Sequence, residues 1–249
     1  MNTPFLSAKT SRYILIFTFV FIFISTLIIN IPTWVLANQI EKYSQHRLKL
    51  YNQSGTFWHG QGLLVATDAK LQQTAPLIYI NWKLSLGLTK YINIKFAMGQ
   101  HEIANVYLDK NGVNLDKLDV HFSIIQVSQL IDVVKDLNIS GNLHVVTNHI
   151  LLTNKSSTGQ FNINISNVST TMSPVNPLGS YNMMFNTSDG KISIDTEPGG
   201  VLSIKGEGSV NGGLILNATI EPSKAEQMKQ FITVMGIPRS DGSYDLKLF

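Results

Sequence analysis

The sequence has 249 residues, of which 44% are hydrophobic and 14% are charged, with a formal net charge of +3 and no cysteine. This length suits one folded domain with a short appendage, and the composition differs from that of a disordered chain. The lack of cysteine excludes a disulfide scaffold, a cysteine-ligated zinc site and a cysteine nucleophile.

Positive charge is not gathered where nucleic acid would need it. Lys9 and Arg12 are the only charged residues among the first 40, and residues 41–249 carry 17 basic and 16 acidic side chains. Nucleic-acid binding relies on positive charge clustered along one face. The basic residues of the body stand singly, so the sequence predicts no nucleic-acid partner.

The segment from Tyr13 to Ile31 is a run of 19 residues without a charge. As a helix it spans about 28 Å, close to the thickness of about 30 Å of a bilayer's hydrocarbon core. Trp34 follows at a position suited to the membrane interface. Residues 13–34 are therefore predicted to form a membrane anchor. The alternative is a cleaved signal peptide, but the apolar run is longer than the 7–15 residues usual for one.

Charge next to the span predicts its orientation. Lys9 and Arg12 precede it, and residues 32–40 hold no basic residue. Lys and Arg are retained on the cytoplasmic side, so residues 1–12 are expected in the cytoplasm and the rest of the chain across the membrane, in the periplasm of a bacterium. Residues 35–54 are predicted as a juxtamembrane linker and residues 55–249 as a β-rich periplasmic domain.

Strand patterns dominate this domain. Residues 161–165 and 191–195 alternate apolar and polar side chains with a period of two, which is typical of half-buried strands, and residues 143–152 and 214–220 are also rich in β-formers. Turn signals separate such segments, including Asn111-Gly112, Ser140-Gly141, Asp189-Gly190, Gly199-Gly200 and Asp241-Gly242. The sequence predicts a mainly β fold with two short helices, its antiparallel strands forming a sandwich or a partly open barrel-like sheet.

Two stretches switch to helical spacing. Apolar residues from Val127 to Leu137 recur three and four apart, and a second helix is predicted from Pro222 to about Met235, where Gly236 ends it. We expect both apolar faces to pack onto the sheet.

No constellation of catalytic residues is evident. The six histidines form no HxH or HExxH pair, and the sequence lacks both a G-x-S-x-G nucleophile motif and a Gly-rich phosphate loop followed by a helix. The sequence therefore predicts no enzyme, no cofactor and no metal site. Trp58 and Trp82 stand out instead, and we expect both to be core anchors rather than exposed partner-binding residues.

Several short motifs, in order along the chain, resemble those of the N component of the bacterial type II secretion system. After the basic N-terminus and the single span come G-T-F-W-H-G with Trp82, then P-L-G-S-Y, then G-I-P and D-G-S-Y near the end. The residues that carry the resemblance are Gly55, Trp58, Gly60, Trp82, Pro177, Leu178, Gly179, Tyr181, Gly236 and Gly242.

This resemblance implies an accessory, single-pass inner-membrane protein of a machine that exports folded proteins across the outer membrane. Its partners would be the inner membrane and other secretion-system components, and it implies no catalytic residue. Two alternatives stay open. One is a periplasmic lipid- or glycan-handling module of the AsmA-like kind, with lipid as a possible partner, and the other is the C component of the same system.

Overall fold

The computed structural model describes residues 8–68, 73–128 and 138–246. Its helices in these ranges are α1 (Ala8–Ile29), α2 (Trp34–Tyr43), α3 (Ile124–Ser128) and α5 (Ala225–Met235), with a 3₁₀ turn η1 (Pro222–Lys224) before α5. The strands are β1 (Leu48–Gly55), β2 (His59–Asp68), β3 (Gln73–Leu86), β4 (Ile92–Met98), β5 (His101–Leu108), β6 (Val113–Ser123), β7 (Ile139–Thr147), β8 (Ile150–Leu152), β9 (Ser157–Thr170), β10 (Gly179–Asn186), β11 (Lys191–Thr196), β12 (Leu202–Ser209), β13 (Gly213–Ile220), β14 (Gly236–Pro238) and β15 (Tyr244–Leu246).

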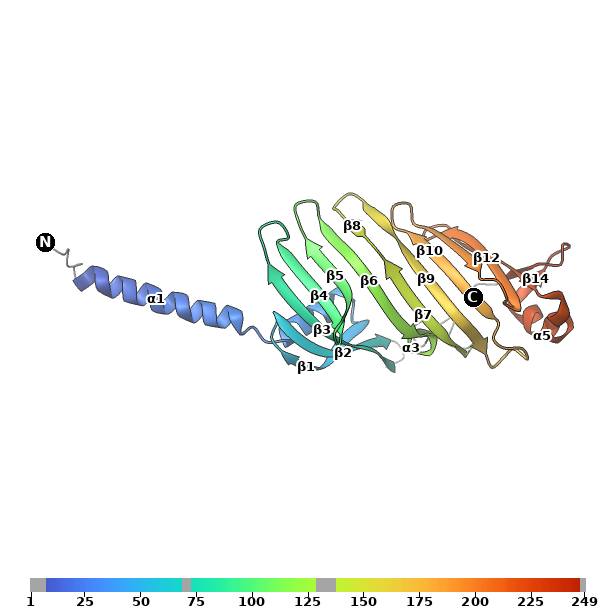
Figure 1. The fold of residues 1–249 in the computed structure, drawn as a ribbon, viewed down its shortest axis with the longest axis horizontal. Helices are drawn as coiled ribbons and strands as arrows, with labels where there is room; N and C mark the ends of the chain where they lie inside the picture. Colours follow the sequence, from blue (N-terminus) through green and yellow to red (C-terminus); the bar gives the residue numbers. More distant parts are fainter. Residues whose placement is uncertain (1–7, 69–72, 129–137, 247–249) are drawn as a thin grey trace.

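All of these strands belong to one antiparallel sheet that runs along the molecule (Figure 1). Strands adjacent in the chain are mostly adjacent in the sheet, from β1 at one edge to β14 at the other, and β8 pairs with both β6 and β9. Its two edge strands do not pair with each other, so the sheet is open. The predicted mainly β, antiparallel fold is confirmed, and a single open sheet matches the barrel-like alternative rather than a sandwich.

The period-two segments form strands as predicted. Phe161–Ile165 lies within β9 and Lys191–Asp195 within β11, and each pairs in register with β10. Glycines supply the backbone conformation of the tight turns, as at Gly190, where φ is +69°. Asp189 supports the same turn, because its carboxylate accepts a hydrogen bond of 3.1 Å from the Lys191 amide. These local signals were sufficient to place β9 and β11.

Two local predictions are wrong in detail. Ser140-Gly141 is not a turn but lies inside β7, where the register with β9 shifts between Ser140 and Asn142. Such a bulge also needs glycine, since φ is +143° at Gly141 and a side chain there would meet the Ser166 carbonyl. The predicted strand over residues 143–152 is interrupted after Thr147, because the chain bends to begin β8.

The second predicted helix is confirmed as η1 followed by α5. Met228, Phe231 and Ile232 are buried on its inner face, as the helical spacing predicts. Gly236 does not take a left-handed cap but is extended and begins β14. The other predicted helix falls mostly on residues 129–137, outside the described residues, and its beginning coincides with the end of α3.

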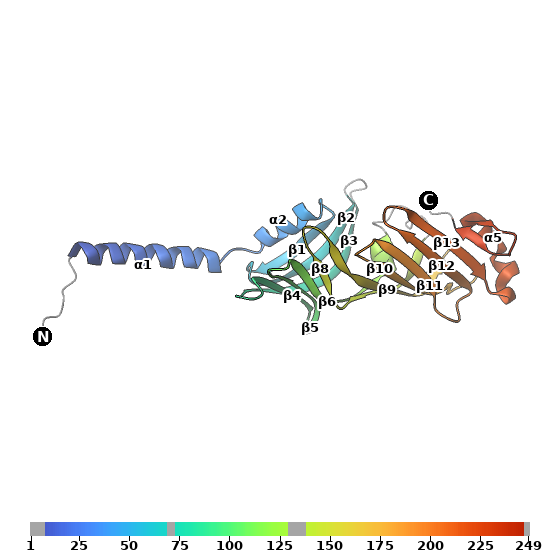
Figure 2. The same ribbon diagram turned by 90° about the horizontal axis from the view of Figure 1, so that it is seen from above.

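The apolar side chains form two clusters along the sheet. Near the membrane anchor, Ala37 of α2 packs with buried residues of the first strands, including Leu50, Ile80 and Trp82. At the far end, α5 packs with Val168, Tyr181 and Leu202 of the later strands among others. Figure 2 shows α2 and α5 at opposite ends of the sheet. A single sheet therefore obtains a core at each end because a helix covers its apolar face there.

Candidate functional site

Helix α1 projects alone from one end of the molecule (Figure 1). It is the one helix in the described ranges long and apolar enough to cross a membrane, and no residue of it from Arg12 to Ile29 is buried. The hydroxyls of Thr18 and Thr26 donate hydrogen bonds of 2.8 Å to carbonyls four residues earlier, which satisfies these polar groups within the helix. Its exposed apolar side chains are suited to contact lipid.

The residues predicted for anchoring and orientation fall around this helix. Lys9, Arg12 and Tyr13 lie in α1, with Tyr13 exposed. Ile31 follows the end of α1, and Trp34 begins α2 and is exposed. The segment from residue 35 to 54, predicted as a linker, contains most of α2 and of β1. The chain thus folds directly beyond the membrane helix.

The G-T-F-W-H-G segment forms the joint between α1 and the sheet. Trp58 Nε1 donates a hydrogen bond of 2.7 Å to the carbonyl of Ile28 near the end of α1. One residue earlier, the Phe57 amide donates 2.8 Å to the Ile31 carbonyl, and Pro32 forms an isolated bridge with Thr56. We call this set of contacts the anchor joint. Carbonyls at a helix end lack partners within the helix, and here Trp58, in the turn between β1 and β2, supplies one.

Trp82 supports the joint from the core side. It is 3% exposed and its Nε1 donates 3.1 Å to the Phe57 carbonyl. Gly60 makes room for it, because a Cβ on Gly60 would lie 2.5 Å from Cζ2 of the Trp82 ring. The expectation that Trp82 is a core anchor is confirmed. Trp58 is only half-buried and lies outside both core clusters, so its expected core role is wrong; it contacts the anchor instead.

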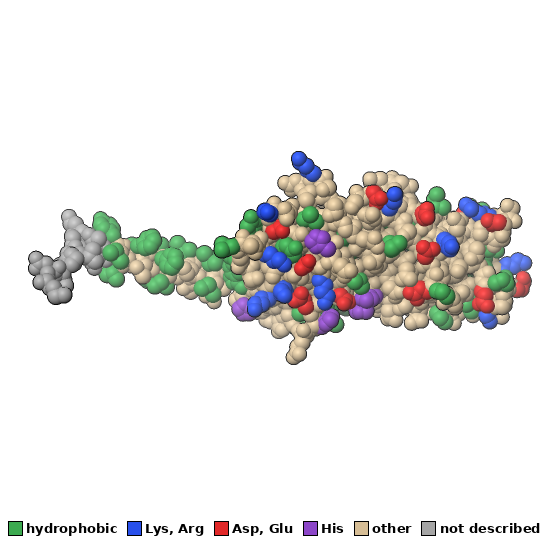
Figure 3. Space-filling model, turned by 45° about the horizontal axis from the view of Figure 1, so that its top comes forward, with side chains coloured by type: hydrophobic (Ala, Val, Ile, Leu, Met, Phe, Trp, Pro, Cys, Tyr) green, Lys and Arg blue, Asp and Glu red, His purple; other side chains and the backbone are tan. Residues whose placement is uncertain are grey.

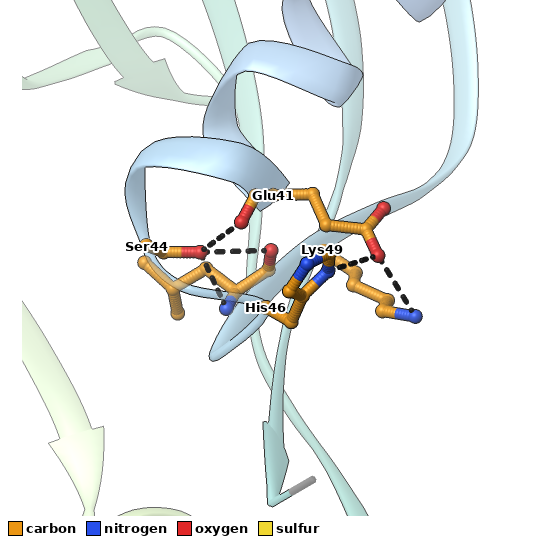
Figure 4. A network of polar contacts seen from close by, with 5 residues as sticks. Glu41, Ser44, His46 and Lys49 are labelled. Atoms are coloured by element: carbon orange, nitrogen blue, oxygen red, sulfur yellow. Dashed lines mark hydrogen bonds and ion pairs between the residues drawn. The ribbon is translucent and has the colours of Figure 1, made fainter.

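A second network fixes the turn from α2 into β1 (Figure 4). The Glu41 carboxylate lies 3.0 Å from Nδ1 of His46 and 3.1 Å from Nζ of Lys49. These hydrogen bonds, first that of His46 and then that of Lys49, lower the pKa of Glu41. Ser44 Oγ donates to the Glu41 carbonyl at 3.1 Å and accepts from the Leu48 amide at 3.0 Å. The turn that leads into the first edge strand is therefore held by both charge and hydrogen bonds.

The P-L-G-S-Y block lies under α5 at the far end. Leu178 and Tyr181 are each 5% exposed, and the Tyr181 hydroxyl donates 3.0 Å to the Leu202 carbonyl. Burial raises the pKa of Tyr181 far above its ordinary value. Gly179 is buried and lies close to Gly200, whereas Pro177 is exposed and follows a cis peptide bond. Leu178 and Tyr181 line an apolar pocket of about 110 Å³ together with Phe231 and Met235.

The last two motif glycines shape the closing hairpin. Gly236 is buried, and a Cβ there would lie 3.0 Å from the Asp245 carbonyl. Gly242 turns the chain with a φ of +83°, and Arg239 Nε donates 2.8 Å to Asp245 across the hairpin. The motif residues thus gather in two separate places, the anchor joint and the end under α5, and not in one active site.

One further group of side chains was not predicted from the sequence. Asp119 and His121 of β6 and His144 of β7 each offer a possible ligand atom, and these atoms lie within 4.8 Å of one another. The Asp119 pKa is lowered, mainly by its hydrogen bond with His144. The register of β6 against β7 pairs His121 with His144. No short sequence motif contains them, because the two histidines are 23 positions apart in the chain.

Comparison with known proteins agrees with the resemblance that the short sequence motifs indicate. Residues 46–247 match the family described as type II secretion system (T2SS), protein N. No curated protein and no solved structure matches the chain. The matched range begins just before β1 and ends after β15, so it includes the whole sheet and both groups of motif residues. The chain belongs to the type II secretion system protein N family.

Proposed function

We propose that this chain is an accessory inner-membrane component of the type II secretion system, which supports the export of folded proteins through contacts with other components. The observation that carries the proposal is the family match over residues 46–247. Helix α1 would hold the protein in the inner membrane, with residues 1–12 in the cytoplasm and the sheet in the periplasm. The proposal favours protein N over the C component, and it assigns the chain no catalytic step.

The anchor joint gives this proposal a mechanical basis. The end of α1 is bound to the sheet through Trp58, Phe57 and the Pro32–Thr56 bridge, and not through an extended linker. A sheet joined in this way keeps one orientation relative to the membrane. Such an arrangement suits a component that presents a fixed surface to partners fixed in the same membrane.

A candidate contact surface lies over β10 to β13. A hollow of about 600 Å³ there is lined by polar side chains and by Met184, Ile192 and Ile215. Three exposed apolar side chains lie in or beside it: Met184 is 46% exposed, Ile215 is 67% exposed, and Val210 nearby is 64% exposed. Exposed apolar side chains rimmed by polar ones are typical of protein-binding surfaces. We call the hollow with these three residues the β10–β13 hollow and propose it as the partner contact.

The test is to recover the full chain from inner membranes of secreting cells and identify the secretion components that co-purify. A double variant, Met184→Asp with Ile215→Asp, should lose these components and lower secretion. Leu152→Asp is the matched control, because Leu152 is similarly exposed but does not line the hollow. If deletion of the whole chain left both secretion and the composition of the complex unaltered, the proposed function would be refuted.

The lipid-handling alternative calls for an apolar space that holds an acyl chain. The apolar pocket under α5 has about 110 Å³, well below the roughly 300–1,000 Å³ usual for small-molecule sites. This pocket is therefore smaller than a lipid carrier needs. Mass spectrometry of the purified protein distinguishes the two, since a lipid-handling module would retain a stoichiometric lipid and the proposed assembly component would not.

A further inference from the structure

Asp119, His121 and His144 lie together on the face of the sheet opposite the core. Asp119 and His121 are two residues apart on β6 and so point to the same side. Val120 between them is buried in the cluster near α2, and Val145 beside His144 packs against that cluster. The three polar side chains thus stand on two strands that are held in place by the core behind them.

Their distances suit coordination of one ion. Asp119 Oδ1 lies 2.9 Å from Nε2 of His144 and 3.7 Å from Nε2 of His121. A tetrahedral zinc ion with bonds of about 2.0–2.1 Å holds neighbouring ligand atoms about 3.3 Å apart. The two observed distances lie on either side of this value, so small side-chain movements bring the atoms to it.

The two imidazole rings are stacked, with centroids 3.8 Å apart and planes 12° apart. This stacking places both Nε2 atoms beside the same carboxylate oxygen. To share an ion, the rings must tilt out of the stack, and the broad χ2 torsion of histidine permits this at little cost. His121 is 69% exposed while Asp119 and His144 are about one-third exposed, so an ion and its water can enter from solvent.

We propose that Asp119, His121 and His144 form a binding site for a divalent transition-metal cation, with zinc as the best fit. Two imidazoles and one carboxylate are the protein ligands of open zinc sites, in which a water molecule completes the tetrahedron as the fourth ligand. Calcium and magnesium prefer sites made of oxygen atoms, so they fit this group less well. The ion would join β6 to β7 at mid-sheet. Figure 3 shows several histidine side chains, in purple, on the half of the body nearer to α1.

The test uses the full chain in detergent, purified with a tag that contains no histidine and freed of metal with a chelator. Zinc is titrated against a coloured competing chelator, and cobalt serves as a spectroscopic probe, since tetrahedral cobalt absorbs visible light strongly. We expect one zinc ion per chain and a tetrahedral cobalt spectrum. His121→Ala and His144→Ala should each weaken zinc binding at least about tenfold.

His149→Ala is the matched control. Its ring lies 3.7 Å from the carboxylate of Asp116, so it is also an exposed His–Asp pair, but it lies outside the group of three. This variant should bind zinc as the unchanged protein does. Far-ultraviolet circular dichroism shows whether each variant is folded. The proposal is overturned if the unchanged chain binds no zinc, if cobalt gives only the octahedral spectrum, or if His149→Ala weakens binding as much as the other two variants.

Discussion

Replacing Ile232 by alanine should strongly destabilise the end of the sheet under α5. Ile232 is fully buried between α5 and the strands. The substitution removes three carbon atoms, each worth about 0.8 kcal/mol on burial, which makes about 2.4 kcal/mol from transfer alone. The cavity that remains adds to this loss, so the free energy of unfolding should fall by about 2–5 kcal/mol.

Val234→Ala on the same helix is the matched control. Val234 is 60% exposed, so its truncation should change the free energy of unfolding by about 0.5 kcal/mol or less. Urea unfolding of the full chain in mild detergent, followed by far-ultraviolet circular dichroism, measures both; tryptophan fluorescence would not, because Trp34, Trp58 and Trp82 all lie at the anchor end. With a slope of about 2 kcal/mol per molar urea, Ile232→Ala lowers the midpoint by about 1 M or more. If both variants shifted the midpoint equally, the docking of α5 as a core element would be wrong.

Three further predictions follow from the motif residues and the membrane end. Tyr181→Phe should lower the free energy of unfolding by about 1 kcal/mol, because a buried hydrogen bond is lost. Burial raises the pKa of Tyr181 above its ordinary 10.0, so the stability of the unchanged protein should decline as the pH rises above that value. Urea unfolding at alkaline pH should show a smaller decline in the variant. Trp58→Phe removes the N–H donor of the anchor joint, so the distance distribution between spin labels at Ile22 and Leu88 should broaden; an unchanged distribution would contradict the joint. Leu88 is 96% exposed in the turn after β3, and the last residues of β3 border the end of α1, so we expect this turn to lie at the membrane surface. In proteoliposomes, a fluorophore on Leu88→Cys should therefore emit at a shorter wavelength than one on Val210→Cys. Equal emission wavelengths would show that the turn lies in water.

The absence of cysteine from the chain makes such labelling specific. An impermeant maleimide also tests the proposed orientation, on a Leu152→Cys variant outside the β10–β13 hollow. This cysteine should react in spheroplasts with an intact inner membrane, because Leu152 is 47% exposed and the sheet is proposed to face the periplasm. Reaction only after the membrane is broken would reverse the orientation that Lys9 and Arg12 predict.

Features that depend only on residues close together in the chain were predictable from the sequence. The uncharged run predicts the membrane helix, since only length and apolarity matter there. The period of two in β9 and β11 predicts half-buried strands, and the spacing of Met228, Phe231 and Ile232 predicts α5. The family resemblance was also carried by short local motifs, and the match over residues 46–247 confirms it.

Features that depend on pairing between distant residues were decided only by the tertiary structure. A glycine in the sequence is compatible with either a turn or a bulge. Only the register with β9 made Ser140-Gly141 a bulge in β7. Trp58 lies at the anchor joint and not in the core because the end of α1 passes beside it. His121 and His144 meet because β6 and β7 pair at that register. A pattern along the chain specifies which side of a strand a residue occupies, whereas its cross-strand neighbour is chosen by the packing of the whole sheet.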